Sequence, residues 1–163
     1  MSDHYYDLCI KLAKQSPCKK RGFGSILELS DSTLPITAYN EPIAPAKHLC
    51  KGDQCIRLEI PSGTDTLICG CGHSEELAIW KAINAGYNVE NAKLYVAGVN
   101  KPDNDPYFKS EPYFYCVRCA TLMYYAKIAG VHVWVNTDQQ WHYLTAEQAY
   151  QSSLDFALKI RTA

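Results

Sequence analysis

A chain of 163 residues is long enough for one domain with a sizeable core, and we expect a single domain over residues 1–163. Its 47% hydrophobic residues are ordinary for a globular protein, and its net charge of −1 argues against binding to long nucleic acid. No apolar run approaches the ~20 residues that span a membrane, and the N-terminus lacks a signal-peptide pattern. We therefore expect a cytoplasmic protein, and for its eight cysteines metal binding or catalysis is a better first expectation than disulfides. Cys9, on the apolar face of the first predicted helix, is expected in the core.

The first half of the chain predicts a helix, a hairpin and a long irregular stretch. Apolar residues recur at helical spacing over residues 5–12. Residues 23–29 and 34–39 predict the two strands of a hairpin, joined by a polar turn. Residues 40–72 are rich in Pro, Gly and Cys and predict irregular structure. Loops of that length are uncommon in compact domains unless something functional holds them.

The second half alternates between helices and strands. This alternation favours an α/β fold, and we expect a three-layer α/β/α sandwich with a sheet covered by helices. Glycine is expected to end both internal helices, and the pair Thr145 and Gln148 forms a plausible capping box for the last one. The elements predicted in chain order are a helix over 75–85 ended by Gly86, a strand over 94–97, a polar loop over 100–111, a helix over 117–129 ended by Gly130, a strand over 131–135, and the final helix.

Two short segments, 71–76 and 115–120, lie where an irregular loop meets the start of a predicted helix. Cys116 and Cys119 are three residues apart on a first helical turn, so both sulfurs can face one ion, and the helix N-terminus favours their thiolates. His73, at the start of the other helix, can supply a third ligand. Three protein ligands with one position left for water are typical of catalytic zinc.

Glu75 follows His73 by two residues and can face water bound at such a zinc ion. Zinc lowers the pKa of bound water to about 7, which produces hydroxide at neutral pH. Glu75 would carry the proton from that water to a ring nitrogen and then to a leaving amine. The order His-x-Glu followed by Cys-x-x-Cys is the signature of zinc deaminases. The alternative is a structural zinc site in which Glu75 only caps its helix.

At these residues the sequence resembles the zinc-dependent cytidine and deoxycytidylate deaminase superfamily. The segment 55–63, followed by Cys69, is similar to a Cys-x-Arg … Pro-Ser-Gly stretch of certain deoxycytidylate (dCMP) deaminases, and residues 38–42 are similar to their Gly-Tyr-Asn-Gly-x-Pro loop. The resemblance extends from about Tyr5 to Val135. It implies a cytidine deaminase-like mixed sheet and conversion of dCMP to dUMP with release of ammonia.

The resemblance and the residue chemistry together give four candidate substrate contacts. Asn40 matches an asparagine that contacts the substrate sugar in the resembling enzymes. The backbone N–H of Ser74 can reach a base carbonyl, Arg57 can bind a phosphate by a two-pronged contact, and Tyr115 can stack on a base. Arg118 could also bind a phosphate, although a surface or structural role is expected for it.

Resembling enzymes use cysteines before the first motif for a second, structural zinc. A closed four-ligand site would fix a loop that has little core of its own. The expected set is Cys50, Cys55 and Cys69 with either Cys18 or Cys71. The alternative is that some of these cysteines are small buried apolar residues.

The sequence also departs from the family pattern. Tyr115 stands where the family usually has Pro, Leu77 where Asn is common, and Glu41 where a Gly is tied to nucleotide regulation. These departures leave two alternatives to a dCMP deaminase. One is a deaminase of another amino-bearing ring, such as guanine, adenosine or a modified base, and the other is a non-catalytic zinc-stabilised binding module. We expect a small-molecule substrate, no membrane partner and, by resemblance, a homo-oligomer.

Overall fold

The computed structural model of the protein describes residues 3–50, 55–61, 70–107 and 115–162. These residues form helices and strands that follow one another in a mixed order. The elements are α1 (His4–Gln15), β1 (Arg21–Glu28), β2 (Ile36–Tyr39), β3 (Glu41–Pro42), the 3-10 helix η1 (Ala44–Leu49), β4 (Cys71–Gly72), α2 (Ser74–Asn84), β5 (Lys93–Asn100), β6 (Asp105–Pro106), α3 (Val117–Tyr125), β7 (Gly130–Val135), β8 (Gln140–Thr145) and α4 (Ala146–Thr162).

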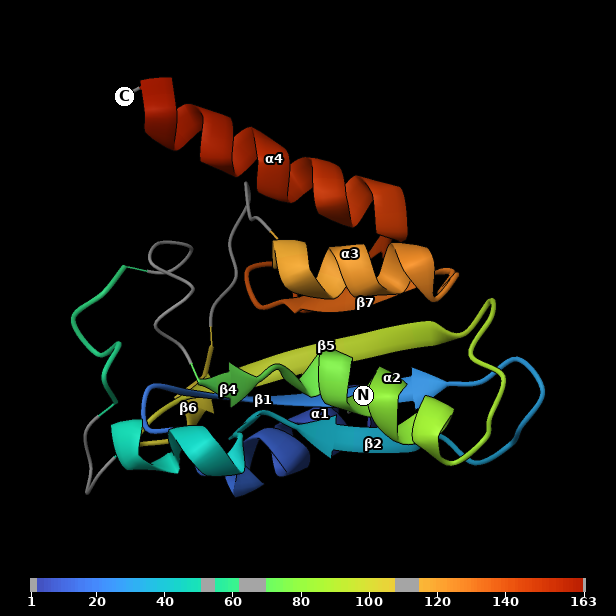
Figure 1. The fold of residues 1–163 in the computed structure, drawn as a ribbon, viewed down its shortest axis with the longest axis horizontal. Helices are drawn as coiled ribbons and strands as arrows, with labels where there is room; N and C mark the ends of the chain where they lie inside the picture. Colours follow the sequence, from blue (N-terminus) through green and yellow to red (C-terminus); the bar gives the residue numbers. More distant parts are fainter. Residues whose placement is uncertain (1–2, 51–54, 62–69, 108–114, 163) are drawn as a thin grey trace.

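The main sheet has the strand order β2-β1-β5-β7-β8, and the short strand β6 pairs with β5. Strands β5 and β7 are parallel, whereas the other pairs in this sheet are antiparallel. Helix α1 packs on β1 and β5, α2 packs on β1 and β2, and α4 lies along α3 (Figure 1). The sheet is therefore mixed and is covered by helices on both faces, which confirms the predicted α/β/α sandwich.

Alternation along β1 separates the two halves of the core. Leu27 faces the large apolar cluster that includes Ala78 of α2 and Met123 of α3. Ile26, one residue earlier, faces the opposite side and packs with Cys9 of α1. Successive strand side chains point to opposite faces of a sheet, so each strand contributes to both layers. The candidate site lies on the α2 and α3 side.

The helix ends only partly follow the prediction. Gly86, with a φ of 83°, ends α2 as expected, because glycine adopts the left-handed conformation at low cost. Helix α3 ends four residues earlier than predicted. Lys127 takes the left-handed position with a φ of 56°, and the Ile128 N–H donates to the Met123 carbonyl. Gly130 instead begins strand β7, so its predicted role as the helix stop is wrong.

The end of the chain contains a strand that was not predicted. Strand β8 pairs antiparallel with β7 and forms the edge of the sheet. Its mixed polar and aromatic sequence gives no clean alternation, which explains why the pattern did not show it. Thr145 and Gln148 do form the predicted capping box: the Thr145 N–H donates to the Gln148 side chain at 2.9 Å, and the Gln148 N–H donates to Thr145 Oγ1 at 3.1 Å.

The stretch 40–72 is more regular than predicted where the structure describes it. Strands β3 and β4 pair antiparallel with Glu41 opposite Gly72, and η1 lies between them in the chain. The beginning and the end of the stretch are therefore brought together directly before His73. Across the described residues, no helix has the length and apolar character needed to cross a membrane.

Candidate active site

The predicted zinc ligands lie at the N-termini of α2 and α3. His73 is the N-cap of α2 and Cys116 is the N-cap of α3, both with extended backbone conformations. Cys119 is the third residue of α3, one turn after Cys116. All three side chains therefore come from the first turns of two helices whose N-termini lie close together.

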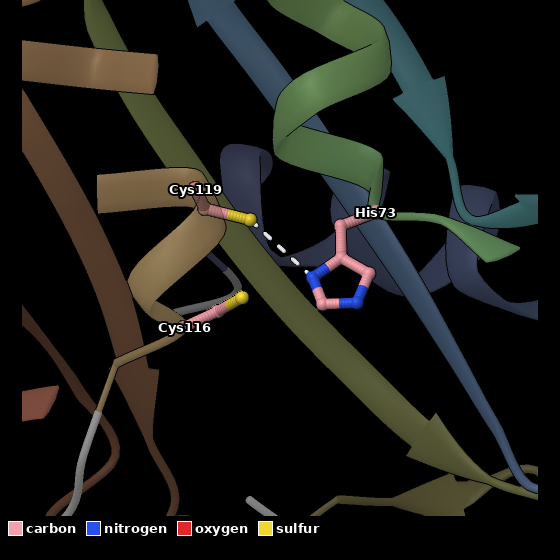
Figure 2. Close-up of side chains that lie close together, drawn as sticks. All are labelled: His73, Cys116 and Cys119. Carbon is pink, nitrogen blue, oxygen red and sulfur yellow. Dashed lines mark hydrogen bonds between the residues drawn. The ribbon is translucent and has the colours of Figure 1, made fainter. Parts of the chain in front are cut away.

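The three side chains converge as the sequence predicts (Figure 2). One nitrogen or sulfur atom from each of His73, Cys116 and Cys119 lies within 4.8 Å of the other two. Nδ1 of His73 lies 3.3 Å from Sγ of Cys119. Ligand bonds of about 2.0 to 2.3 Å at a tetrahedral zinc place donor atoms ~3.5 Å apart, so the spacing and the donor chemistry both fit zinc.

The electrostatics of the three ligands suit a cation. A hydrogen bond from Cys119, the largest cause, lowers the pKa of Cys116 to about 3 despite partial burial. Burial raises the pKa of Cys119 well above its usual range, so Cys119 keeps its proton without a metal. Burial opposes a charge on His73, but the adjacent Cys116 thiolate raises the pKa of His73 to about 9. Because both protons must leave for these atoms to bind a metal, zinc binding strengthens as pH rises.

Glu75 is only 8% exposed and has a hydroxyl partner on each carboxylate oxygen. The phenol of Tyr115 donates to Oε1 at 2.9 Å, and Oγ of Ser74 donates to Oε2 at 3.1 Å. Ser74 also shares a hydrogen bond of 2.7 Å with Ser25 of β1. The orientation of the carboxylate is therefore fixed on one side by Ser74, which is bonded to the central sheet, and on the other side by Tyr115. Sequence analysis did not find Ser25, because no local pattern connects it to Ser74.

Tyr115 is 1% exposed and is held at three points. Besides the bond to Glu75, its backbone N–H donates to Oγ of Ser152 at 3.0 Å, and Oγ of Ser153 donates to its carbonyl. Burial and the negative charge of Glu75 raise the pKa of its phenol well above the usual range. Tyr115 thus links helix α4 to the Glu75 carboxylate. The predicted stacking of its ring on a base stays a prediction.

The other substrate-contact candidates lie at different places in the fold. Asn40 is buried directly before β3, where its Oδ1 accepts from the Phe23 N–H at 2.6 Å and its Nδ2 donates to the Arg21 carbonyl at 3.0 Å. It therefore fastens β1 to the chain that leads into β3. Arg57 lies in a turn, and its carbonyl accepts from Nζ of Lys20 at 2.7 Å.

The cysteines proposed for a second zinc are not gathered into a site by the described part of the chain. There, the group formed by His73, Cys116 and Cys119 is the one set of three or more metal-ligand side chains close enough to share an ion. Cys71 lies in β4, opposite Pro42 of β3. Cys69 lies outside the described residues. No three of the described members of the predicted set have their sulfur atoms close enough to share one ion. These members are Cys18, Cys50, Cys55 and Cys71.

An ion pair that was not predicted links the two helices at the site. Arg118 lies between the two cysteine ligands and donates from Nε to Oε1 of Glu76 at 3.2 Å and from Nη2 to Oε2 at 2.7 Å. Oε2 of Glu76 also accepts from the His73 N–H at 3.0 Å. The sequence does place an acidic residue in the first turn of one helix and an arginine in the first turn of the other. The ion pair could have been predicted from these two residues, because two helices that share one metal also bring their other first-turn side chains close together.

Comparisons with known proteins found one family model and several solved structures similar to this chain. The family model for the cytidine and deoxycytidylate deaminase zinc-binding region matches residues 1–135. A cytidine deaminase from Burkholderia pseudomallei superposes with a TM-score of 0.56 and 16% identity, covering 91% of this chain and 96% of that chain. A cytidine deaminase from Mycobacterium tuberculosis gives a TM-score of 0.47 and 10% identity, covering 87% of each chain. No curated protein sequence matches.

The fold, the ligand set and the family match together define a zinc-dependent hydrolytic deaminase that acts on a small-molecule pyrimidine. The chain belongs to the cytidine and deoxycytidylate deaminase family. The Burkholderia pseudomallei structure, at its low identity, supports the fold alone.

Proposed function

We propose that the protein deaminates a free pyrimidine nucleotide or nucleoside, with dCMP as its preferred substrate. In that reaction dCMP and water give dUMP and ammonia. The Cys-x-Arg … Pro-Ser-Gly segment and the Asn40 loop support dCMP. Cytidine is the second candidate, because the Burkholderia pseudomallei structure that resembles the fold is a cytidine deaminase.

The observation that carries the proposal is the position of Glu75. Its carboxylate is buried, lies two residues from the ligand His73, and has both oxygens oriented by hydroxyl groups. A structural metal site does not require a buried carboxylate held in one orientation. A proton shuttle does, because general acid–base catalysis depends on the carboxylate being placed at the atoms that exchange the proton.

Zinc bound by His73, Cys116 and Cys119 would lower the pKa of a water molecule and so supply hydroxide at neutral pH. Glu75 would take one proton from that water and deliver it to the ring nitrogen next to the amino-bearing carbon, while the water oxygen bonds to that carbon. Glu75 would then take the remaining proton from this new hydroxyl group and pass it to the amine. The carbonyl would form as the carbon–nitrogen bond breaks and ammonia leaves. The Tyr115 and Ser74 hydroxyls hold the carboxylate in place during both transfers.

Substrate binding is proposed for four residues. The backbone N–H of Ser74 binds the base carbonyl, and Tyr115 forms part of the wall beside the base. Asn40 contacts the sugar through its second amide hydrogen, since its other side-chain bonds already hold β1. Arg57 binds the phosphate. Loss of Arg57 should therefore weaken binding of dCMP and leave cytidine binding unchanged.

Ammonia release from zinc-loaded protein tests the proposal, using dCMP, dCTP, cytidine, cytosine, guanine and adenosine. We expect the highest kcat/KM with dCMP. Turnover of cytidine above that of dCMP would replace dCMP by the second candidate. Turnover of only guanine or adenosine, or of no compound in the panel, would contradict a free pyrimidine nucleotide or nucleoside as substrate.

A cytoplasmic homo-oligomer remains our expectation. Several large apolar side chains of α3 and α4 are exposed in the single chain, and contiguous exposed apolar surface marks interaction sites. Light scattering of the purified protein would measure the assembly, and a monomeric mass would contradict it. The exposed residues on these helices are Val117, Tyr124, Tyr125, Tyr150, Leu154 and Leu158.

A further inference from the structure

The two halves of the metal site are carried by helices that pack mainly against different partners. Helix α2, which follows His73, packs chiefly on β1 and β2. Helix α3, which carries Cys119, packs chiefly against α4. Packing between α2 and α3 is slight by comparison. Both helices contribute to the same apolar core, so the spacing between the histidine ligand and the two sulfurs depends on that shared core and on contacts made at the helix N-termini.

The Glu76–Arg118 ion pair is such a contact. We infer that this pair is a positioning device for zinc: it holds the histidine half of the site at a fixed distance from the cysteine half. Glu76 is joined to both halves, because the oxygen that accepts from Nη2 of Arg118 also accepts from the His73 N–H. Arg118 is flanked by the two cysteine ligands, so any movement of its backbone moves their sulfurs.

The geometry separates this pair from an ordinary surface salt bridge. Exposed ion pairs usually contribute little, because water screens them and two long side chains lose their freedom. Here the contact is two-pronged, which adds directional constraint, and the Glu76 side chain is only 15% exposed. The Arg118 side chain is 42% exposed, so the consequence is expected mainly in ligand placement and not in overall stability. Groups behind metal ligands typically affect metal affinity about 10- to 100-fold.

The chain supplies matched variants. Glu76→Gln removes the charge but keeps an oxygen that can accept from the His73 N–H, so the capping of α2 is retained. Arg118→Gln removes the guanidinium from the other side of the pair. The control is Lys127→Gln, which breaks the exposed Lys127–Glu90 pair of 3.4 Å just after the C-terminal end of α3, whereas the cysteine ligands lie at its N-terminal end.

Zinc affinity, measured by titrating the zinc-loaded protein with a chromophoric chelator at constant pH, tests the inference without any substrate. We expect zinc to bind about 10-fold more weakly in Glu76→Gln and in Arg118→Gln, and with unchanged affinity in Lys127→Gln. The zinc affinity of the double variant should fall by no more than that of the weaker-binding single variant, because both substitutions break the same contact.

Wild-type zinc affinity in either single variant would overturn the inference. A double variant whose fold-decrease in zinc affinity equals the product of the two single decreases would also overturn it, because the two residues would then act independently. Because zinc binding is the readout, an absence of dCMP turnover would contradict only the proposed reaction. Arg118→Gln decides the matter by itself if Glu76→Gln does not fold, since the Arg118 side chain is substantially exposed.

Discussion

Two carboxylates bonded to tyrosines lie on opposite faces of the same sheet. Glu75, on the α2 and α3 side, accepts from the phenol of Tyr115 at 2.9 Å. Glu28, at the end of β1 on the α1 side, accepts from the phenols of Tyr5 at 3.0 Å and Tyr95 at 3.4 Å. The local bonding is similar in kind. The difference is that Glu75 lies on the first turn of a helix that begins at a metal ligand.

This comparison isolates the feature on which the proposed catalytic role of Glu75 depends. A tyrosine–carboxylate bond orients the carboxylate in both clusters, so it cannot by itself distinguish them. Within the described residues, ligands able to share a metal occur only beside Glu75. The Glu28 cluster therefore serves as an internal control: equivalent changes there remove the same type of bond and are expected to leave the proposed proton transfer unchanged.

The largest difference is expected from the carboxylates themselves. Glu75→Gln removes the proton shuttle and keeps the side-chain shape, so kcat should fall by about 10²- to 10⁴-fold while zinc content is unchanged. Glu28→Gln should leave kcat unchanged. Ammonia release and metal analysis of the two purified variants make the measurement. A Glu75→Gln protein with near wild-type kcat would remove the basis of the mechanism.

A smaller difference is expected from the tyrosines. Tyr115→Phe removes one hydrogen bond to the Glu75 carboxylate and keeps the ring, so kcat should fall ~10-fold, the equivalent of about 1.4 kcal/mol, with little change in KM. A role in base binding alone would raise KM instead. Steady-state kinetics separate the role in positioning Glu75 from the role in base binding. Equal changes in kcat and KM would show that neither role is the sole explanation.

The smallest effect is expected from Tyr5→Phe. It removes the phenol that binds Glu28, on the face of the sheet away from the zinc ligands, and should lower the free energy of unfolding by about 1 kcal/mol. Its kcat and KM should match those of the unmodified protein. Denaturant unfolding with parallel kinetics checks both statements. A kcat as low as that of Tyr115→Phe would show that the two faces of the sheet are coupled, and the comparison would lose its control.

Local chemistry in the sequence was enough to predict the candidate ligands and the proposed proton shuttle. The spacing of Cys116 and Cys119 follows one helical turn, and His73 and Glu75 are two residues apart, so each half of the motif is fixed by the geometry of its own helix. The hairpin of β1 and β2 and the capping box at Thr145 were predictable for the same reason. Each depends on residues close together in the chain.

The tertiary structure alone decided which distant residues support the site. The bonds from Tyr115 to Glu75 and from Arg118 to Glu76 join residues 40 and 42 positions apart. The Asn40 side chain is occupied by the backbone of β1, and β8 adds to an edge that only the folded sheet presents. A hydrogen bond or ion pair of this kind requires two elements to be placed within ångströms of each other. That placement depends on the packing of the whole core, which periodicity within a segment does not encode.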